Sequence, residues 1–350
     1  MALSLAAKPL ALKLKYWKHE LPFKYPFTIS KGTKTHQPTL FVELALGPFK
    51  GYGEAPAINY YNITVDQMIA DLEAKKVFVE KFALTDPERY WHYLHHLFPK
   101  NPFLVCALDM AGWDLWGKMK GIPLYKLWNT AFTENLPFTD YTIGLDTMEK
   151  MVEKIKEKPW PVYKIKMGVE GDVEMIEEIR KHTNAILRVD ANEGWDTAEM
   201  AMEKITKLAN LGVELVEQPL KKDNWEGMKI LYNHSPIPLI ADESCVFEAD
   251  VEKCVGFFHG INIKLTKCSG ITPARRMISK ARSLDLKVMM GCMNESSIGS
   301  AAIVNFSPQL DYMDADGPLL LSQDVAGGLN YSFGSIALGK YSGLGIISHL

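Results

Sequence analysis

The chain has 350 residues, of which 47% are hydrophobic and 23% are charged, and its formal net charge is -3 at pH 7. This composition is typical of a globular protein with a large core, and the length suits one barrel together with a smaller domain. The near-neutral charge and the lack of a basic stripe with interleaved aromatic residues argue against nucleic acid as a partner.

Residues 1–125 are predicted to form a separate α+β unit. Alternating apolar and polar residues predict strands over 10–16 and 39–46, and helical patterns begin after Thr64, a suitable N-cap. Helices are expected over 65–82, 87–97 and 103–118. The polar segment 28–35 and the segment 54–62 are predicted to be loops, and we expect the first of them to be mobile.

From about residue 126, short β-branched runs alternate with amphipathic helical patterns. The predicted strands end near Ile143, Lys166, Asp190, Glu217, Asp242, Lys264, Gly291 and Asp314. Their spacing of about 22 to 27 residues predicts an α/β fold, a (β/α)8-type TIM barrel over 126–320 that carries the active site. The segment 321–350, rich in Gly and Ser, is expected to return to the first unit, so that the two together form a capping domain.

Three acidic residues end adjacent predicted strands: Asp190, Glu217 and Asp242. One such residue alone commonly caps the following helix. Strand C-termini in a barrel meet at one mouth, so three carboxylates would converge there and repel one another unless a cation joins them. All-oxygen ligation favours Mg²⁺, one ion per subunit, with Mn²⁺ as a substitute.

Lysines at two strand ends suggest a proton-transfer device. Lys164 and Lys166 point to the same side of their strand, and we expect their repulsion to lower the pKa of at least one, with Lys164 tuning Lys166. An exposed, solvated pair is the alternative. Lys264 ends the sixth strand, across the barrel from the second, so Lys166 and Lys264 would reach a substrate from opposite faces. This arrangement suits removal and return of a proton at one carbon, with the metal stabilising a developing enediolate.

Together these residues resemble the enolase superfamily, and within it the muconate-lactonizing subgroup. The resemblance is carried by Gly53-Glu54-Ala55-Pro56, Lys164-Ile165-Lys166, Asp190-Ala191-Asn192, Glu217-Gln218-Pro219, Ala241-Asp242-Glu243-Ser244 and Asn262-Ile263-Lys264. It implies that the three acidic residues are metal ligands and that Lys166 and Lys264 are the acid/base catalysts. It also implies that Glu243 and Asn192 lie behind the ligands and orient them, although a turn-stabilising role for Asn192 stays open.

Asp314 and Asp316, at the end of the eighth strand, resemble the feature with which dipeptide epimerases hold the free α-amino group of the substrate. The stretch Gly291-Cys292-Met293-Asn294-Glu295-Ser296 also resembles that group, which implies substrate contacts for Met293 and Glu295. The alternative is that the two aspartates only cap a loop.

Members that act on Ala-Glu are expected to carry an arginine near residue 30, but no arginine precedes Arg89. Gly32 aligns with that position, and Lys31 and Lys34 are nearby. The resemblance therefore favours an uncharged, apolar C-terminal residue, as in Ala-Val, with L-Ala-D/L-Glu epimerase as the alternative. Phe27, Ile29 and Gly32 are expected at the substrate, with Phe23, Tyr60 and Tyr61 as further candidates for the pocket or as core residues.

Other readings remain open. Within the subgroup they are o-succinylbenzoate synthase and N-acylamino-acid racemase. From other classes they are a Schiff-base aldolase that uses Lys264 as its nucleophile and a non-catalytic binding protein that kept the scaffold. The five cysteines have no Cys-x-x-Cys spacing, so free thiols and a cytoplasmic location are expected. A dipeptide is the expected partner, no membrane is involved, and a homo-oligomer stays open.

Overall fold

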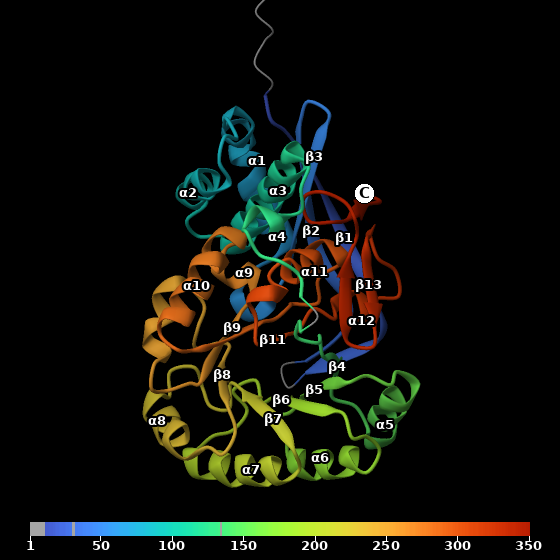
Figure 1. Ribbon diagram of the computed structural model, residues 1–350, viewed down its shortest axis with the longest axis vertical. Helices are drawn as coiled ribbons and strands as arrows, with labels where there is room; N and C mark the ends of the chain where they lie inside the picture. Colours follow the sequence, from blue (N-terminus) through green and yellow to red (C-terminus); the bar gives the residue numbers. More distant parts are fainter. Residues whose placement is uncertain (1–10, 30–31, 134) are drawn as a thin grey trace, which may run out of the picture.

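The structure is a computed structural model that describes residues 11–29, 32–133 and 135–350. In Figure 1 an antiparallel sheet with helices lies above a ring of parallel strands with helices outside it. Each part has its own hydrophobic core: one contains Leu40 and Leu104, and the other contains Ile165 and Ile261.

The capping sheet consists of β1 (Lys13–Ile29), β2 (Gly32–Leu46) and β3 (Phe49–Pro56), paired antiparallel in chain order. The turn η1 (Asn59–Tyr61) and helices α1 (Val65–Lys81), α2 (Pro87–Leu97) and α3 (Pro102–Lys120) follow. Helix α3 packs directly against β3. The approach is so close that a Cβ added at Gly53 would lie 2.0 Å from the carbonyl oxygen of Ala107. Glycine at this position therefore permits the close approach of strand and helix.

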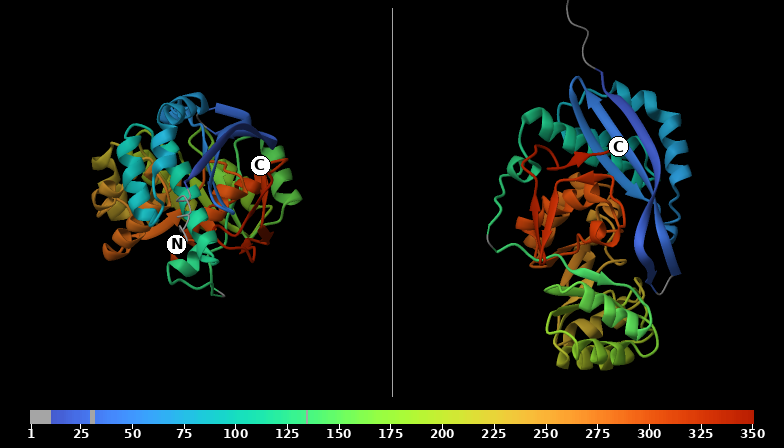
Figure 2. Two further views of the ribbon diagram at one scale, coloured as in Figure 1. Left: turned by 90° about the horizontal axis from the view of Figure 1, so that it is seen from above. Right: turned by 90° about the vertical axis from the view of Figure 1, so that its right-hand side faces the viewer.

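The segment 28–35 differs from the predicted loop. Thr28 pairs with Thr33 and Phe27 pairs with Lys34, so the arms of a long β1–β2 hairpin extend almost to its tip. Residues 30 and 31, including Lys31, lie outside the described residues. The right-hand view of Figure 2 shows this blue hairpin reaching from the capping sheet towards the barrel.

The predicted barrel is confirmed. Its strands are β4 (Tyr141–Ile143), β5 (Val162–Lys166), β6 (Ile186–Asp190), β7 (Val213–Glu217), β8 (Leu239–Ala241), β9 (Gly260–Ile263), β10 (Lys287–Met290) and β11 (Tyr312–Met313). Each strand pairs in parallel with the next along the chain, and a parallel bridge between Thr139 and Met313 joins the two ends of the sheet. The strand ends therefore gather at one mouth, beneath the capping sheet.

Helices connect these strands on the outside, except after β8, where two short 3-10 turns replace a helix. They are α5 (Met148–Glu157), α6 (Asp172–Arg180), α7 (Ala198–Asn210), α8 (Trp225–His234), α10 (Ile271–Ser283) and α11 (Ser297–Val304), with the 3-10 turns η2 (Glu248–Asp250), η3 (Glu252–Cys254) and η4 (Ser307–Gln309) and the short helices α4 (Leu124–Leu127), α9 (Leu265–Cys268) and α12 (Gly317–Leu320). Among the described residues, none of the helices combines the length and the apolar character needed to cross a membrane.

Buried carboxylates of the first 125 residues dock onto helix N-termini of the barrel. Asp109 accepts hydrogen bonds from the backbone N–H of Thr272 at 2.9 Å and from its hydroxyl at 2.8 Å, at the start of α10. Glu54 accepts from the Ser296 hydroxyl at 2.6 Å and the Gly299 N–H at 2.8 Å, at the start of α11. These hydrogen bonds join the capping sheet and α3 to the barrel and hold them over its mouth.

The C-terminal segment contains β12 (Ala326–Gly327), β13 (Leu329–Ser332), β14 (Ser335–Leu338) and β15 (Ile347–Ser348). It contacts the first 125 residues at two places: the N–H of Ser322 donates to the carbonyl of Pro22 at 2.9 Å, and the N–H of Leu344 donates to Asp114 at 2.8 Å. These contacts support the expected return of the chain, while the domain boundaries near 125 and 320 stay a prediction.

Candidate active site

The three predicted metal ligands meet at the barrel mouth. Asp190 and Glu217 are the last residues of β6 and β7, and Asp242 directly follows β8. One carboxylate oxygen from each lies within 4.8 Å of the others, and all three side chains are buried. Three negative charges at this separation in a buried site require compensation by cations.

One oxygen of each carboxylate is held by a donor of the protein. The backbone N–H of Asn192 donates to Asp190 Oδ1 at 3.0 Å, and the side-chain amide of Asn262 donates to Glu217 Oε1 at 2.7 Å. Lys267 forms an ion pair with Asp242 Oδ1. These contacts fix the orientation of each carboxylate and leave one oxygen of each directed towards lysine side chains.

The remaining oxygens form ion pairs with the three predicted lysines. The Nζ–O distances are 2.6 Å for Lys166 to Asp190 Oδ2, 2.6 Å for Lys264 to Asp242 Oδ2 and 2.8 Å for Lys164 to Glu217 Oε2. Positive charge is therefore concentrated beside the three converging oxygens. The donor set, three carboxylates with no nitrogen or sulfur donor among them, fits a hard divalent cation such as Mg²⁺.

Lys164 lies among carboxylates from distant parts of the chain, which the local sequence did not predict. Its ammonium group lies 2.9 Å from Asp314 Oδ2 and 3.4 Å from Asp190 Oδ2, in addition to its contact with Glu217. Burial alone would lower the pKa of Lys164, but the Asp314, Glu217 and Asp190 carboxylates raise it well above its ordinary value. Like-charge repulsion therefore does not lower the pKa of Lys164, and the expected tuning of Lys166 by Lys164 stays a prediction.

The two predicted acid/base residues lie on opposite sides of the barrel mouth. Lys166 ends β5 and Lys264 follows β9, and three strands separate β5 from β9 in the sheet order. Both side chains are largely buried, yet both line the same cavity. Burial lowers the pKa of Lys264, but Asp242 and Glu217 outweigh this effect and raise it well above its ordinary value.

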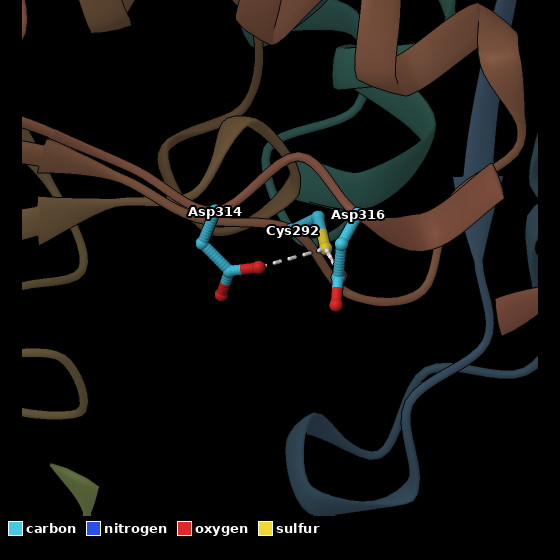
Figure 3. Close-up of side chains that lie close together, drawn as sticks. All are labelled: Cys292, Asp314 and Asp316. Atoms are coloured by element: carbon cyan, nitrogen blue, oxygen red, sulfur yellow. Dashed lines mark hydrogen bonds between the residues drawn. The ribbon is translucent and has the colours of Figure 1, made fainter. Parts of the chain in front are cut away.

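Asp314 and Asp316 come together with Cys292, as Figure 3 shows. The Cys292 sulfur lies 3.6 Å from Oδ1 of each aspartate. Asp316 Oδ2 accepts the backbone N–H of Thr142 at 2.6 Å, and Asp314 Oδ2 is held by Lys164. Burial and the neighbouring Asp314 carboxylate raise the pKa of Asp316 to about 7. The two Oδ1 atoms thus form an anionic pair at the β11 side of the site.

A cavity of about 520 Å³ connects the two lysines with Asp314. From the barrel side it is lined by Lys166, Lys264, Asp242, Asn192, Glu243, Thr142, Cys292, Met293, Asn294 and Asp314. From the other side it is lined by Phe27, Ile29, Gly32, Thr33, Lys34, Ile58, Asn59, Tyr60 and Tyr61. The predicted residues Phe27, Ile29 and Gly32 therefore do lie at the cavity, as do Tyr60 and Tyr61.

Glu295 differs from its expected place, because it is buried and is not among the residues that line the cavity. Its carboxylate accepts the backbone N–H of Met293, and burial raises its pKa to about 7. Glu295 therefore supports the loop that carries Met293. Asn192 lies at the cavity in a left-handed conformation with φ of 46°, and its N–H orients Asp190, so both expected roles have a basis in its geometry.

Several contributing residues carried no recognised signal in the sequence. Lys267 follows Lys264 by three residues and looks like an ordinary helix residue, yet its side chain is buried against Asp242. Cys292 was expected to be only a free thiol. Tyr60 donates to Glu193 at 3.0 Å and so joins the capping loop to the barrel, a contact between residues far apart in the sequence.

The chain is similar to known proteins over almost its whole length. Two family models match it: "Mandelate racemase / muconate lactonizing enzyme, N-terminal domain" over residues 12–128 and "Enolase C-terminal domain-like" over residues 146–347. The L-Ala-D/L-amino acid epimerase of Flavobacterium johnsoniae is 47% identical over 335 residues, covering 96% of this chain and 99% of the relative. The L-Ala-D/L-Glu epimerase of Bacteroides thetaiotaomicron is 37% identical over 341 residues, covering 96% and 88%.

A solved structure extends this similarity to the whole fold. The dipeptide epimerase from Cytophaga hutchinsonii, complexed with Mg and the dipeptide D-Ala-L-Val, has a TM-score of 0.89 and 27% identity to this chain, covering 97% of this chain and 96% of that one. The resemblance predicted from the motifs is confirmed, and the chain belongs to the mandelate racemase / muconate lactonizing enzyme family of the enolase superfamily.

Proposed function

We propose that the protein is a Mg²⁺-dependent dipeptide epimerase that inverts the α-carbon of the C-terminal residue by 1,1-proton transfer through an enediolate. The observation that carries this proposal is one cavity with Lys166 and Lys264 on opposite sides and the Asp314 carboxylate at a third. The names of the relatives support it, since they include an L-Ala-D/L-amino acid epimerase and a dipeptide epimerase bound to Mg and a dipeptide.

Asp190, Glu217 and Asp242 would hold the cation, each through the oxygen that faces the lysines. When bound, Mg²⁺ supplies positive charge that stabilises the negative charge developing on the substrate carboxylate. The ion pairs with Lys166 and Lys264 lower the pKa of Asp190 and Asp242, which favours the ionised form of these two carboxylates.

Proton transfer is the task of the two cavity lysines. The neutral amine of one lysine, Lys166 or Lys264, removes the α-proton, and the ammonium group of the other delivers a proton to the opposite face of the same carbon. Lys164 is more deeply buried among carboxylates and does not line the cavity, so it acts by neutralising Asp314 and Glu217. The permanent charge that its raised pKa implies fits this role.

Substrate recognition would be divided between polar and apolar residues. Asp314 lines the cavity, and its Oδ1 atom, with that of the neighbouring Asp316, would accept N–H groups of the substrate ammonium, a charge-assisted contact. Phe27, Ile29 and Tyr61 supply apolar lining of the same cavity, which favours an uncharged C-terminal side chain such as that of Val.

Lys34 favours a second candidate, L-Ala-D/L-Glu epimerase, the activity named for the Bacteroides thetaiotaomicron relative. Lys34 lines the same cavity, and its ammonium donates to the side chain of Gln37 at 3.1 Å. Burial lowers the pKa of Lys34, and a lysine lacks the two-pronged geometry with which an arginine binds a carboxylate. We therefore rank the apolar side chain first.

A panel of dipeptides in D₂O with Mg²⁺ tests the proposal. Deuterium should enter the α-position of the C-terminal residue, faster for L-Ala-L-Val than for L-Ala-L-Glu. Equal or faster exchange with L-Ala-L-Glu would overturn the ranking, and no exchange with any dipeptide would overturn the proposed function. A cytoplasmic location follows from the cysteine pattern as a further prediction, and a homo-oligomer remains a matter for direct measurement.

A further inference from the structure

Lys267 is a buried lysine with no part in proton transfer. Its Nζ donates to the carbonyl of Asp242 at 2.6 Å, to the carbonyl of Cys245 at 3.1 Å and to the carbonyl of Asn262 at 3.3 Å, and it forms an ion pair with Asp242 Oδ1. The side chain is 1% exposed. Four acceptors thus surround its three N–H groups and fix its charge against Oδ1 of Asp242, while Lys264 pairs with Oδ2.

Asn262 engages one oxygen of Glu217, as Lys267 engages one oxygen of Asp242. Its amide nitrogen donates to Glu217 Oε1 at 2.7 Å, and both side chains are fully buried. The amide is confined from the other side by Gly291, where an added Cβ would lie 2.8 Å from it. Glu217 Oε1 is therefore engaged by a buried donor packed against Gly291, while Oε2 faces Lys164.

Engaging one oxygen of each carboxylate limits how it can bind a cation. Mg²⁺ requires near-octahedral geometry at about 2.0 to 2.1 Å, whereas Ca²⁺ takes six to eight oxygens at about 2.3 to 2.6 Å and readily accepts both oxygens of one carboxylate. We propose that Lys267 and Asn262 are positioning residues that hold Asp242 and Glu217 as one-oxygen donors and so make the site select a small octahedral cation over Ca²⁺. This inference rests on the proposed function, because it requires that the three carboxylates bind a divalent cation.

A purely structural role for these residues predicts a different result. If Lys267 and Asn262 only stabilised the fold, their loss would weaken the binding of Mg²⁺ and Ca²⁺ alike. If they restrict the carboxylates, their loss frees a second oxygen, which Ca²⁺ can use and Mg²⁺ cannot. The ratio of the two affinities therefore separates the two roles without any measurement of catalysis.

The experiment is calorimetric titration of the metal-free, full-length protein with Mg²⁺ and with Ca²⁺. Lys267→Met and Asn262→Ala are each expected to raise the affinity ratio of Ca²⁺ to Mg²⁺ about tenfold relative to wild type, since freed carboxylate oxygens favour the larger ion. Lys204→Met, which breaks the partly buried Lys204–Asp172 ion pair outside the site, should leave the ratio unchanged.

An unchanged ratio in the folded variants would overturn the inference while leaving metal binding, and the proposed function, intact. If Lys267→Met does not fold, Asn262→Ala decides, because it removes a neutral side chain. Failure of the wild-type protein to bind either ion would instead overturn the cofactor of the proposed function, and the inference with it.

Discussion

Asp316→Asn tests how the substrate ammonium is bound. In the structure Asp316 Oδ2 accepts the N–H of Thr142 at 2.6 Å, and its Oδ1 faces Cys292. The backbone N–H still needs an acceptor in the variant, so the amide oxygen takes that position and the amide NH₂ turns towards the ammonium site. An acceptor is thereby replaced by a donor beside a cation.

Loss of one hydrogen bond to a charged group costs about 1.5 to 3 kcal/mol, which corresponds to a rise of about 10- to 150-fold in KM. The assay is kcat and KM for a dipeptide and for the same dipeptide acetylated at its amino group. We expect the dipeptide KM to rise at nearly constant kcat, while the weak turnover of the acetylated compound changes little. Asp223→Asn, at an exposed position, serves as the control. Equal losses for both substrates would refute the assigned role of Asp316.

Three further predictions concern Asp109, Tyr60 and the metal. Burial raises the pKa of Asp109 from 3.8 to about 7, so the folded protein favours the protonated carboxyl. This preference stabilises the fold fully below about pH 4, and the contribution, about 4 kcal/mol, is lost as the pH rises through 7. Asp109→Asn should reduce the dependence of the unfolding free energy on pH over this range, as measured by urea titration at several pH values. An unaltered dependence would contradict burial of Asp109 as its cause. Tyr60→Phe removes the hydrogen bond to Glu193 that joins the capping loop to the barrel, and it should raise the dipeptide KM about 5-fold with little change in Tm. An unchanged KM would contradict a contribution of this contact to substrate binding. Removal of divalent cations with EDTA should stop α-proton exchange and added Mg²⁺ should restore it, and exchange that persists without metal would exclude the metal from the reaction.

The barrel and its carboxylates were predictable because the signal is local. Each strand is a short apolar run, and each ends at a polar residue such as Asp190 or Glu217. Parallel strands bring their C-termini to one edge, so the sequence order alone implies that these residues converge. The strand residues near the tip of the β1–β2 hairpin were predicted to be a loop, because polar, exposed strand residues resemble those of a loop.

Contacts between distant segments could not be predicted in the same way. Lys164 was expected to act on Lys166, two residues away, but its ammonium also pairs with Asp314, 150 positions along the chain, whose carboxylate raises the pKa of Lys164. The burial of Lys267 and the join between Tyr60 and Glu193 likewise depend on how the elements pack. Local patterns contain no information about which charges tertiary packing brings together.

The two-base arrangement is tested most directly by deuterium exchange with Lys166→Ala and Lys264→Ala. Each dipeptide epimer is incubated with each variant in D₂O, and both α-deuterium incorporation and inversion are followed by NMR and chiral chromatography. The structure predicts that neither variant inverts the substrate, and that each still exchanges the α-proton of one epimer only, with opposite choices for the two variants. Inversion by either variant, or exchange of both epimers by one of them, would contradict an account in which Lys166 and Lys264 serve opposite faces.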